Sequence, residues 1–572
     1  MSGHASQTAS GVRPYPVAGA PLLCDAREHG LTGDGTTNDQ PALAALVDRL
    51  GDAFTADGRA RVIYCPPGVY AIRDAGTVWR SGVSLMGAGP GATRFVLSNE
   101  GDRSQAVPLA FYTAQLHGAS PDRHLAYCTF ADFEIDGSGV AGAQYNPLSK
   151  GLGLQYVTGG LFRNLFIHHT AATGFGCDFL QDTLVQAVRV LECGRLDNGM
   201  EMGGAGIGVG IGGWGPMERL TIAHCVAVGN ATNGIFLEMQ HPDRPQPRGI
   251  RIIGCHAEAN RFGISDWGAD GLIVTGCTMT GNLEAGFQVS AKGTTGIPGK
   301  GGLLTDCVID GNLRDGVNIG NTGGPYTVRG NRITGNGRYG YHHQDLGDGD
   351  RAVAEEIVIE SNDIWGNSLD GIRLDRPLRD AVIINNRIRN NGRQCAGAAS
   401  GGGESVRYAQ NSLVDQRADW PADGHRGKVL RVGHWYAVVA ANDATTLTLA
   451  PIRPGSASSW NADTPPPKAP YELPAAPADR PGITVNATAD AVTIRGNLIR
   501  DTKSRTQTHG IRITDRGSCV NCYVVENDLD GNQIAIQPDG PLAAGYWDGN
   551  HGDQVRNPGR GVDADRDGQP VV

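Results

Sequence analysis

Carboxylates, amides, a histidine and arginines recur in this 572-residue chain a few residues after a repeated glycine. After Gly234, Gly286, Gly316, Gly340 and Gly371, one set of alternate positions is apolar. Because alternate side chains of a strand point to opposite faces, the other set is expected to face solvent together. It contains Asp178, Phe236, Glu238, Gln288, Ser290, Asn318, His342, Gln344, Arg373, Asp375 and Arg512, with Asp182, Asp345 and Asp515 just beyond the strands.

These residue types suit proton transfer on a sugar. Hydrolysis of a glycosidic bond uses two carboxylates, about 5 Å apart for retention and about 6.5–9.5 Å apart for inversion. A lyase or an epimerase needs instead a base that removes the proton next to a uronate carboxylate, beside an arginine or a metal. Three pairs of carboxylates could fill these roles: Asp345 with Asp375, Glu238 with Asp178, and Glu238 with Asp266. The candidate catalytic residues are therefore Glu238, Asp266, Asp345, Asp375 and His342.

Further side chains could hold the sugar by hydrogen bonds or by ring stacking. The coil that contains Asp266 is one residue short, so the faces of Asp266 and Trp267 stay open. No metal ligands are predicted: a hydrolase would need no cofactor, whereas a lyase could use calcium. The candidate substrate-binding residues are Asp178, Asp182, Trp214, Trp267, Gln288, Asn318, Arg373 and Arg512.

A repeat between about residues 220 and 395 sets these positions. Its period varies, but an asparagine always follows five residues after a cysteine or asparagine, which is typical of a solenoid. The alternating runs between these positions predict short parallel strands. The first position is expected to hold buried, reduced cysteines and the second a ladder of stacked asparagines. The first column is Cys225, Cys255, Cys277, Cys307, Asn331, Asn362 and Asn386; the second is Asn230, Asn260, Asn282, Asn312, Asn336, Asn367 and Asn391.

Residues 24–95 resemble the N-terminal segment of rhamnogalacturonase/epimerase-like proteins in the pectate-lyase-like superfamily. The matching stretches are Asp25, the run GLTGDGTTND at 30–39 and the run VIYCPPGVY at 62–70. The resemblance implies an all-β, right-handed, single-stranded parallel β-helix. Asp39 is expected to cap a helix that begins near Pro41 and covers the open end of the solenoid. Hydrolases, lyases, epimerases and phage tailspikes share this segment, so the resemblance implies the fold and not the activity.

The catalytic motifs of two families in this group are absent. Polygalacturonases carry Asn-Thr-Asp, Asp-Asp, Gly-His-Gly and Arg-Ile-Lys, of which Thr508–Gly510 and Arg512–Thr514 are partial echoes. The Asp-Pro-His-Glu motif of mannuronan epimerases is missing too. No catalytic residue is therefore carried over from either family.

The repeat also divides the chain. We predict a flexible N-terminus over 1–23, a capped β-helix over 24–400, a small β insertion over 401–480, the last coils over 481–540 and a tail over 541–572. In the insertion, strands are expected at Lys428–Val432, Trp435–Ala440 and Thr445–Leu449.

Composition limits the function classes. A net charge of −10 without a basic run argues against nucleic acid, and no apolar stretch is long enough for a membrane span. The N-terminus does not resemble a secretory signal, so a cytoplasmic location is the default, with secretion or a virion as alternatives. Two interpretations remain open: a carbohydrate-active enzyme, with a glycoside hydrolase ahead of a lyase or epimerase, or a non-catalytic sugar-binding β-helix such as a tail fibre or adhesin. Either would bind a polysaccharide or oligosaccharide as a monomer or a homotrimer.

Overall fold

The computed structural model describes residues 21–73, 76–99, 111–112, 118–141, 146–196, 204–290, 295–320, 324–345, 353–395, 397–433, 435–450, 468–502, 506–552 and 559–560. Most of the predicted flexible N-terminus and much of the predicted tail lie outside these ranges. Among the described residues, no helix is both long and apolar enough to cross a membrane.

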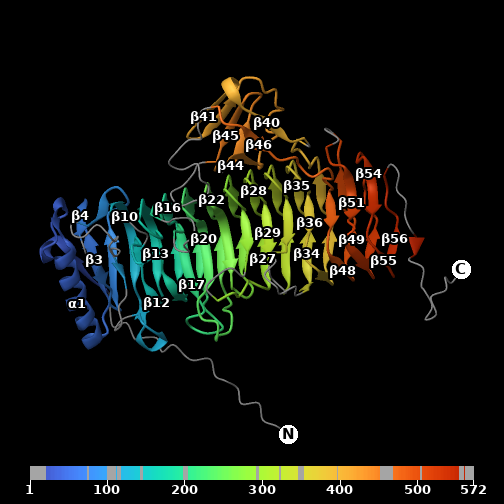
Figure 1. The fold of residues 1–572 in the computed structure, drawn as a ribbon. Helices are drawn as coiled ribbons and strands as arrows, with labels where there is room; N and C mark the ends of the chain where they lie inside the picture. Colours follow the sequence, from blue (N-terminus) through green and yellow to red (C-terminus); the bar gives the residue numbers. More distant parts are fainter. Residues whose placement is uncertain are drawn as a thin grey trace, which may run out of the picture.

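The chain winds into a long solenoid of stacked parallel strands (Figure 1). One coil consists of β21 (Arg251–Ile253), β22 (His256–Glu258) and β23 (Phe262–Trp267), which pair in parallel with β24 (Ile273–Thr275), β25 (Thr278–Thr280) and β26 (Phe287–Val289) of the next coil. Their inward side chains form one continuous hydrophobic core. The predicted right-handed parallel β-helix is confirmed.

Two columns of polar hydrogen bonds run along the turns. Each backbone N–H of the predicted asparagine ladder, from Asn230 to Asn367, donates to the side-chain oxygen of the next member at 2.9–3.1 Å. In the other column the backbone N–H of Cys277 donates to Cys307 Sγ at 3.4 Å, and that of Cys307 to Asn331 Oδ1 at 2.9 Å. The four cysteines at 225, 255, 277 and 307 are buried and form no disulfide, as predicted.

Helix α1 (Gln40–Asp57) closes the N-terminal end and buries Leu43, Leu46 and Leu50. Asp39 occupies the N-cap position, but its side chain does not bond to the helix. Its carboxylate accepts instead from the backbone N–H of Thr32 at 2.6 Å. The prediction that the Asp39 side chain caps the helix is therefore wrong, because its carboxylate is hydrogen-bonded to the loop that precedes the helix.

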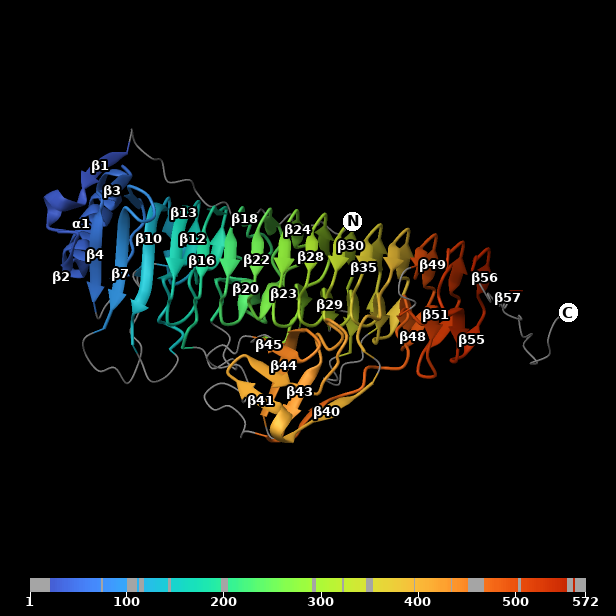
Figure 2. The same ribbon diagram turned by 90° about the horizontal axis from the view of Figure 1, so that it is seen from above.

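A separate antiparallel sheet of seven strands projects from the solenoid between β40 (Ala399–Gly401) and β46 (Tyr471–Leu473). It has its own small core and lies alongside the middle of the solenoid (Figure 2). Its β43 (Val429–Val432), β44 (Trp435–Asn442) and β45 (Thr446–Leu449) correspond to the three expected strands. The guanidinium of Arg426 donates to the carbonyl of Gly311, which joins the insertion to a solenoid turn.

The C-terminal coils extend beyond the predicted end at residue 540. Strand β56 (Tyr546–Asp548) pairs in parallel with β53 (Tyr523–Val525) and buries Trp547. The side chain of Asn550 also accepts from the backbone of Asn527, so the turn column continues with it.

Candidate active site

One sheet of the solenoid carries the predicted polar face. Its ten parallel strands are β17 (Ile207–Ile211), β20 (Asn233–Met239), β23, β26, β29 (Val317–Gly320), β32 (Tyr341–Gln344), β36 (Ile372–Leu374), β47 (Ile483–Val485), β51 (His509–Ile513) and β54 (Ile534–Pro538). Strand register aligns the outward residues of successive coils in one row: Gln288, Asn318, His342, Arg373, Thr484 and Arg512.

Asp266 does not belong to that face. It is in register with Leu237 and Val289, whose side chains point into the core, and it is fully buried. Its carboxylate accepts from the backbone N–H of Ala269 at 2.9 Å and lies 3.4 Å from the Tyr326 hydroxyl. Burial raises its pKa to about 7. The short coil shifts the alternation by one residue, so Asp266, one of the predicted catalytic residues, turns into the core and does not line the polar face.

Asp178 and Glu238 lie towards the N-terminal end of the face. Asp178, on β14 (Asp178–Gln181), accepts from the Gly210 backbone N–H at 2.7 Å and lies 3.5 Å from Lys150 Nζ. Glu238 is outward but only 7% exposed, and it stands five strands from Asp375. At about 4.8 Å per strand, some 24 Å separate them, so Glu238 cannot act on the same bond as Asp375.

Three further predicted residues make contacts that hold loops and strands together. Asp182 forms an exposed ion pair with Arg219. The indole N–H of Trp214 donates to the carbonyl of Phe179 at 2.6 Å. Arg512 pairs with Asp539 at 2.9 Å and also with Asp479. These contacts do not bring the three residues to the cluster described next.

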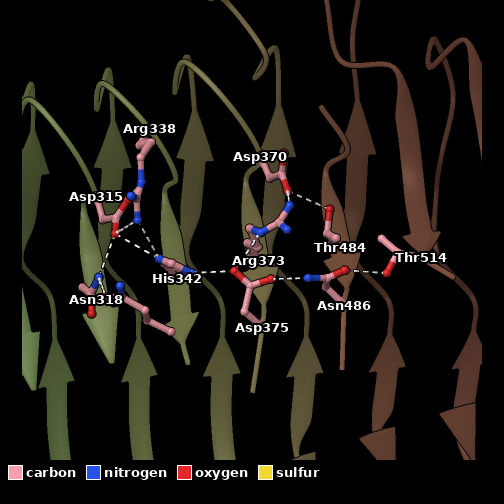
Figure 3. Close-up of polar contacts among 11 residues, drawn as sticks. Asp315, Asn318, Arg338, His342, Asp370, Arg373, Asp375, Thr484, Asn486 and Thr514 are labelled. Carbon is pink, nitrogen blue, oxygen red and sulfur yellow. Dashed lines mark hydrogen bonds and ion pairs between the residues drawn. The ribbon is translucent and has the colours of Figure 1, made fainter. Parts of the chain in front are cut away.

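His342 on β32 lies at the centre of a charged cluster (Figure 3). Its Nδ1 lies 3.1 Å from Asp315 Oδ2, and its Nε2 lies 2.9 Å from Asp375 Oδ2. Arg338 makes two hydrogen bonds of 2.8 Å to Asp315. The side chain of His342 is 4% exposed, so a ligand has almost no direct access to it.

The second half of the cluster surrounds Asp375. Arg373 Nε donates to its Oδ2 at 2.9 Å, and Asn486 Nδ2 donates to its Oδ1 at 2.7 Å. Arg373 also reaches Asp370 at 3.3 Å, and Asp370 accepts from the Thr484 hydroxyl at 2.7 Å. Asp375 therefore has a fixed orientation, set by three donors from three strands or their ends.

Burial and pairing oppose each other in the pKa values of these groups. Burial disfavours the charge of Asp375, but the bonds to His342 and Arg373 outweigh it and hold its pKa well below the usual range. Burial also disfavours the charge of His342, yet Asp315 and Asp375 raise its pKa above the ordinary value. Asp370 is dominated by burial, which raises its pKa to about 6. Asp375 is thus an ionised carboxylate, and its contact with His342 favours the charged form of the imidazole.

Asp375 also opens to solvent. Its side chain is 21% exposed and lines an open pocket of about 520 Å³. Asp345, directly after β32, lines the same pocket together with Arg373, Asn486 and Arg516. Of the predicted catalytic residues, the structure therefore brings together Asp345, Asp375 and, behind them, His342.

Five residues of this site were not predicted from the sequence: Asp315, Arg338, Asp370, Asn486 and Arg516. Asp315 and Asp370 directly precede the repeated glycines Gly316 and Gly371. That repeat position was the signal that could have identified them, because equal positions in successive coils lie on the same side of the solenoid. Asn486 belongs to a coil that follows the insertion, and no spacing in sequence relates it to Asp375.

Comparisons with known proteins give one family profile and several solved structures of low identity. Residues 217–430 match the profile of the family described as "Periplasmic copper-binding protein (NosD)". No curated protein matches the chain significantly. Among the described residues, no group of three or more His, Cys, Asp or Glu side chains could hold a metal ion.

Three solved structures illustrate the similarity. The mannuronan C-5 epimerase AlgE4 A-module of Azotobacter vinelandii is 16% identical over 91% of this chain and 99% of its own, with a TM-score of 0.37. The surface adhesin PfbA of Streptococcus pneumoniae is 14% identical over 76% and 100%, with a TM-score of 0.44. The family 28 exopolygalacturonase of Yersinia enterocolitica is 11% identical over 65% and 76%, with a TM-score of 0.45. At these scores the likeness adds nothing about activity, and the β-helix assignment rests on the strand pairing of this chain.

Proposed function

We propose that the chain binds a carbohydrate along the sheet from β20 to β54 and hydrolyses a glycosidic bond in the pocket between β32 and β51. The observation that carries this proposal is the presence of two carboxylates, Asp345 and Asp375, in one open pocket. Guanidinium and amide groups of Arg373, Asn486 and Arg516 beside them suit sugar hydroxyls.

The role of Asp375 follows from its surroundings, and Asp345 takes the complementary role because it lines the same pocket. Asp375 is ionised and held in place, so it serves as the nucleophile that attacks the anomeric carbon. Asp345, at the end of the neighbouring strand, protonates the oxygen that leaves the anomeric carbon as the bond to Asp375 forms. Asp345 then takes a proton from a water that attacks the same carbon, and this attack breaks the bond to Asp375 and releases its carboxylate. Neighbouring strands are about 4.8 Å apart, which is closer to the separation in retaining enzymes than in inverting ones.

Hydrolysis is favoured over a lyase or epimerase reaction that uses His342 as the base. Both ring nitrogens of His342 are engaged by carboxylates, and the ring is nearly inaccessible. A substrate proton therefore cannot reach it. Asp375 is the group that such a reaction would have to use instead.

Binding without cleavage is the second candidate. Three donors already hold Asp375, and such bonds lower the basicity and nucleophilicity of a carboxylate. This is the feature expected of a residue that only shapes a binding groove.

The test is a polysaccharide panel incubated with the full chain. Hydrolysis predicts new reducing ends without the ultraviolet absorbance of an unsaturated uronate. That absorbance would overturn hydrolysis in favour of a lyase. Retention of a polysaccharide with no new ends at all would establish the binding function.

A further inference from the structure

A second pocket of about 230 Å³ opens on the same sheet, closer to its N-terminal strands. It is lined by Trp267 of β23, Gln288 of β26, Asn318 of β29 and Arg314 from the turn before β29. Trp267 stands four strands from Asp375, or about 19 Å at the usual strand spacing. The two pockets are thus far enough apart to hold different sugar residues of one chain.

The pocket contains a buried acceptor without a donor. Asn318 is 7% exposed, and its Nδ2 donates to Asp315 Oδ2 at 2.7 Å and to Gln344 Oε1 at 2.8 Å. Its Oδ1 is buried and accepts no hydrogen bond from any described residue. Exchanging the amide oxygen and nitrogen would place the oxygen against the Asp315 carboxylate, so the orientation is fixed. A shift of the Asn318 side chain would bring this oxygen to a ligand hydroxyl, and the bond would relieve a cost of about 1–3 kcal/mol.

The charges lining this pocket leave one cation in excess. Arg261 pairs with Glu284 at 2.9 Å, and Arg338 pairs with Asp315 at 2.8 Å. Arg314, also in the lining, makes no ion pair with a described residue. A guanidinium in this position binds a carboxylate or a sulfate through two parallel hydrogen bonds.

Trp267 supplies the apolar part of the pocket. Its indole N–H donates to Gln288 Oε1 at 3.3 Å, and Phe236 packs edge-on against the ring at 5.0 Å. These contacts hold the indole in one orientation. Trp267 is 9% exposed, so only the part of the indole that lines the pocket offers an apolar contact to a sugar ring.

We propose that this second pocket is a separate binding subsite for an acidic sugar residue. Asn318 Oδ1 accepts a sugar hydroxyl, Arg314 pairs with the carboxylate or sulfate, and Trp267 contacts the ring. The inference rests on the proposed function, because the subsite would hold the same chain that reaches Asp375. It defines the ligand as an anionic oligosaccharide that spans both pockets.

The experiment is a glycan array that displays carboxylated, sulfated and neutral oligosaccharides, from disaccharides to about octasaccharides. It is probed with the wild-type chain and with Arg314→Gln, Asn318→Ala, Asp375→Asn and Arg329→Gln. Arg329 is an exposed arginine on another face and serves as the matched control. Wild type and Arg329→Gln are expected to bind the longer anionic glycans, whereas Asp375→Asn reports what the other pocket contributes to binding. The carboxylated and sulfated arms identify which anion Arg314 selects.

Arg314→Gln should weaken binding at least about tenfold, as expected for the loss of one charge-assisted pair. Asn318→Ala should also weaken glycan binding relative to the wild type. Thermal unfolding checks that this variant is folded. Unchanged binding by Arg314→Gln, or wild-type binding only to neutral glycans, would overturn the subsite. Neither result touches the proposed cleavage, which the turnover of Asp375→Asn tests separately.

Discussion

Nε2 of His342 lies 2.9 Å from Oδ2 of Asp375, and the two side chains come from adjacent strands of the polar face. Burial disfavours the charge of His342, yet Asp315 and Asp375 raise its pKa, and the bonds from His342 and Arg373 lower the pKa of Asp375. Asp315 lies on the opposite side of the ring, so both ring nitrogens contact a carboxylate. The contact from His342 therefore helps to hold Asp375 ionised without touching a substrate, which makes His342 a positioning residue.

The first prediction replaces His342 by glutamine. The variant removes the imidazole that bonds to Asp375 and lowers its pKa, so the pKa of Asp375 should rise towards its ordinary value. The acidic limb of the turnover profile should then move to higher pH, and maximal turnover should fall at least about tenfold. The measurement is turnover against pH on a polysaccharide that the panel identifies.

The control for this variant is His169→Gln, since His169 is 46% exposed and pairs with Glu192 away from the cluster. Its pH profile should match that of the wild type. An unshifted acidic limb in His342→Gln, with turnover lowered or not, would show that His342 does not set the ionisation of Asp375.

The second prediction concerns the buried Asp266. Folding raises its pKa from 3.8 to about 7, so the folded state binds the proton more tightly than the unfolded state. Its stabilising contribution is complete below pH 3.8 and is lost as the pH rises to about 7. As the pH rises from 3.8 to about 7, the free energy of unfolding of Asp266→Asn should therefore increase relative to that of the wild type, by a few kcal/mol in total.

Urea unfolding of both proteins at several pH values measures this difference. Asp182→Asn is the control, because Asp182 is an exposed residue of a surface ion pair. A difference between wild type and Asp266→Asn that is independent of pH would contradict the buried, protonated state of Asp266.

The third prediction tests the turn column at Cys307. Its sulfur accepts the backbone N–H of Cys277, and Asn331 plays the same part for Cys307. Cys307→Ala leaves a buried N–H without an acceptor and should cost about 1–3 kcal/mol in the free energy of unfolding. Cys307→Asn extends the asparagine column by one coil and should cost less. Urea unfolding measures both variants. A greater loss of unfolding free energy in Cys307→Asn than in Cys307→Ala would show that side-chain volume, and not hydrogen bonding, determines which residue is tolerated at this position.

Most of the fold could be predicted because each coil of the repeat is marked by residues that are close together in the sequence. The interval from Cys255 to Asn260 recurs in each coil, and equal intervals must stack when parallel strands coil. The same reasoning placed Asn318, His342, Arg373 and Asp375 on one face. The face of Asp266 could not be predicted in this way. One missing residue in its coil reverses the alternation of inward and outward side chains, and this reversal depends on how the strand joins its turn.

The site itself was less predictable, because it depends on side chains that meet across coils. Asp315 and Asp370 occupy a turn position, and only their contacts with His342 and Arg373 reveal a function. Asn486 reaches Asp375 across the whole insertion, a separation of 111 residues. Glu238, in contrast, has the expected type and face but lies too many strands away, so its distance from the cluster and not its chemistry excludes it.

The most direct test of the central claim is the release of reducing ends by Asp375→Asn and Asp345→Asn. The panel polysaccharide that gives the highest turnover with wild type is the substrate, and Glu238→Gln is the carboxylate control from the far end of the same face. We predict that Asp375→Asn lowers turnover at least about 100-fold, Asp345→Asn lowers it by a comparable factor, and Glu238→Gln keeps turnover within about twofold. Full turnover in Asp345→Asn and Asp375→Asn, or its loss in Glu238→Gln alone, would contradict the assignment of this pocket as the active site.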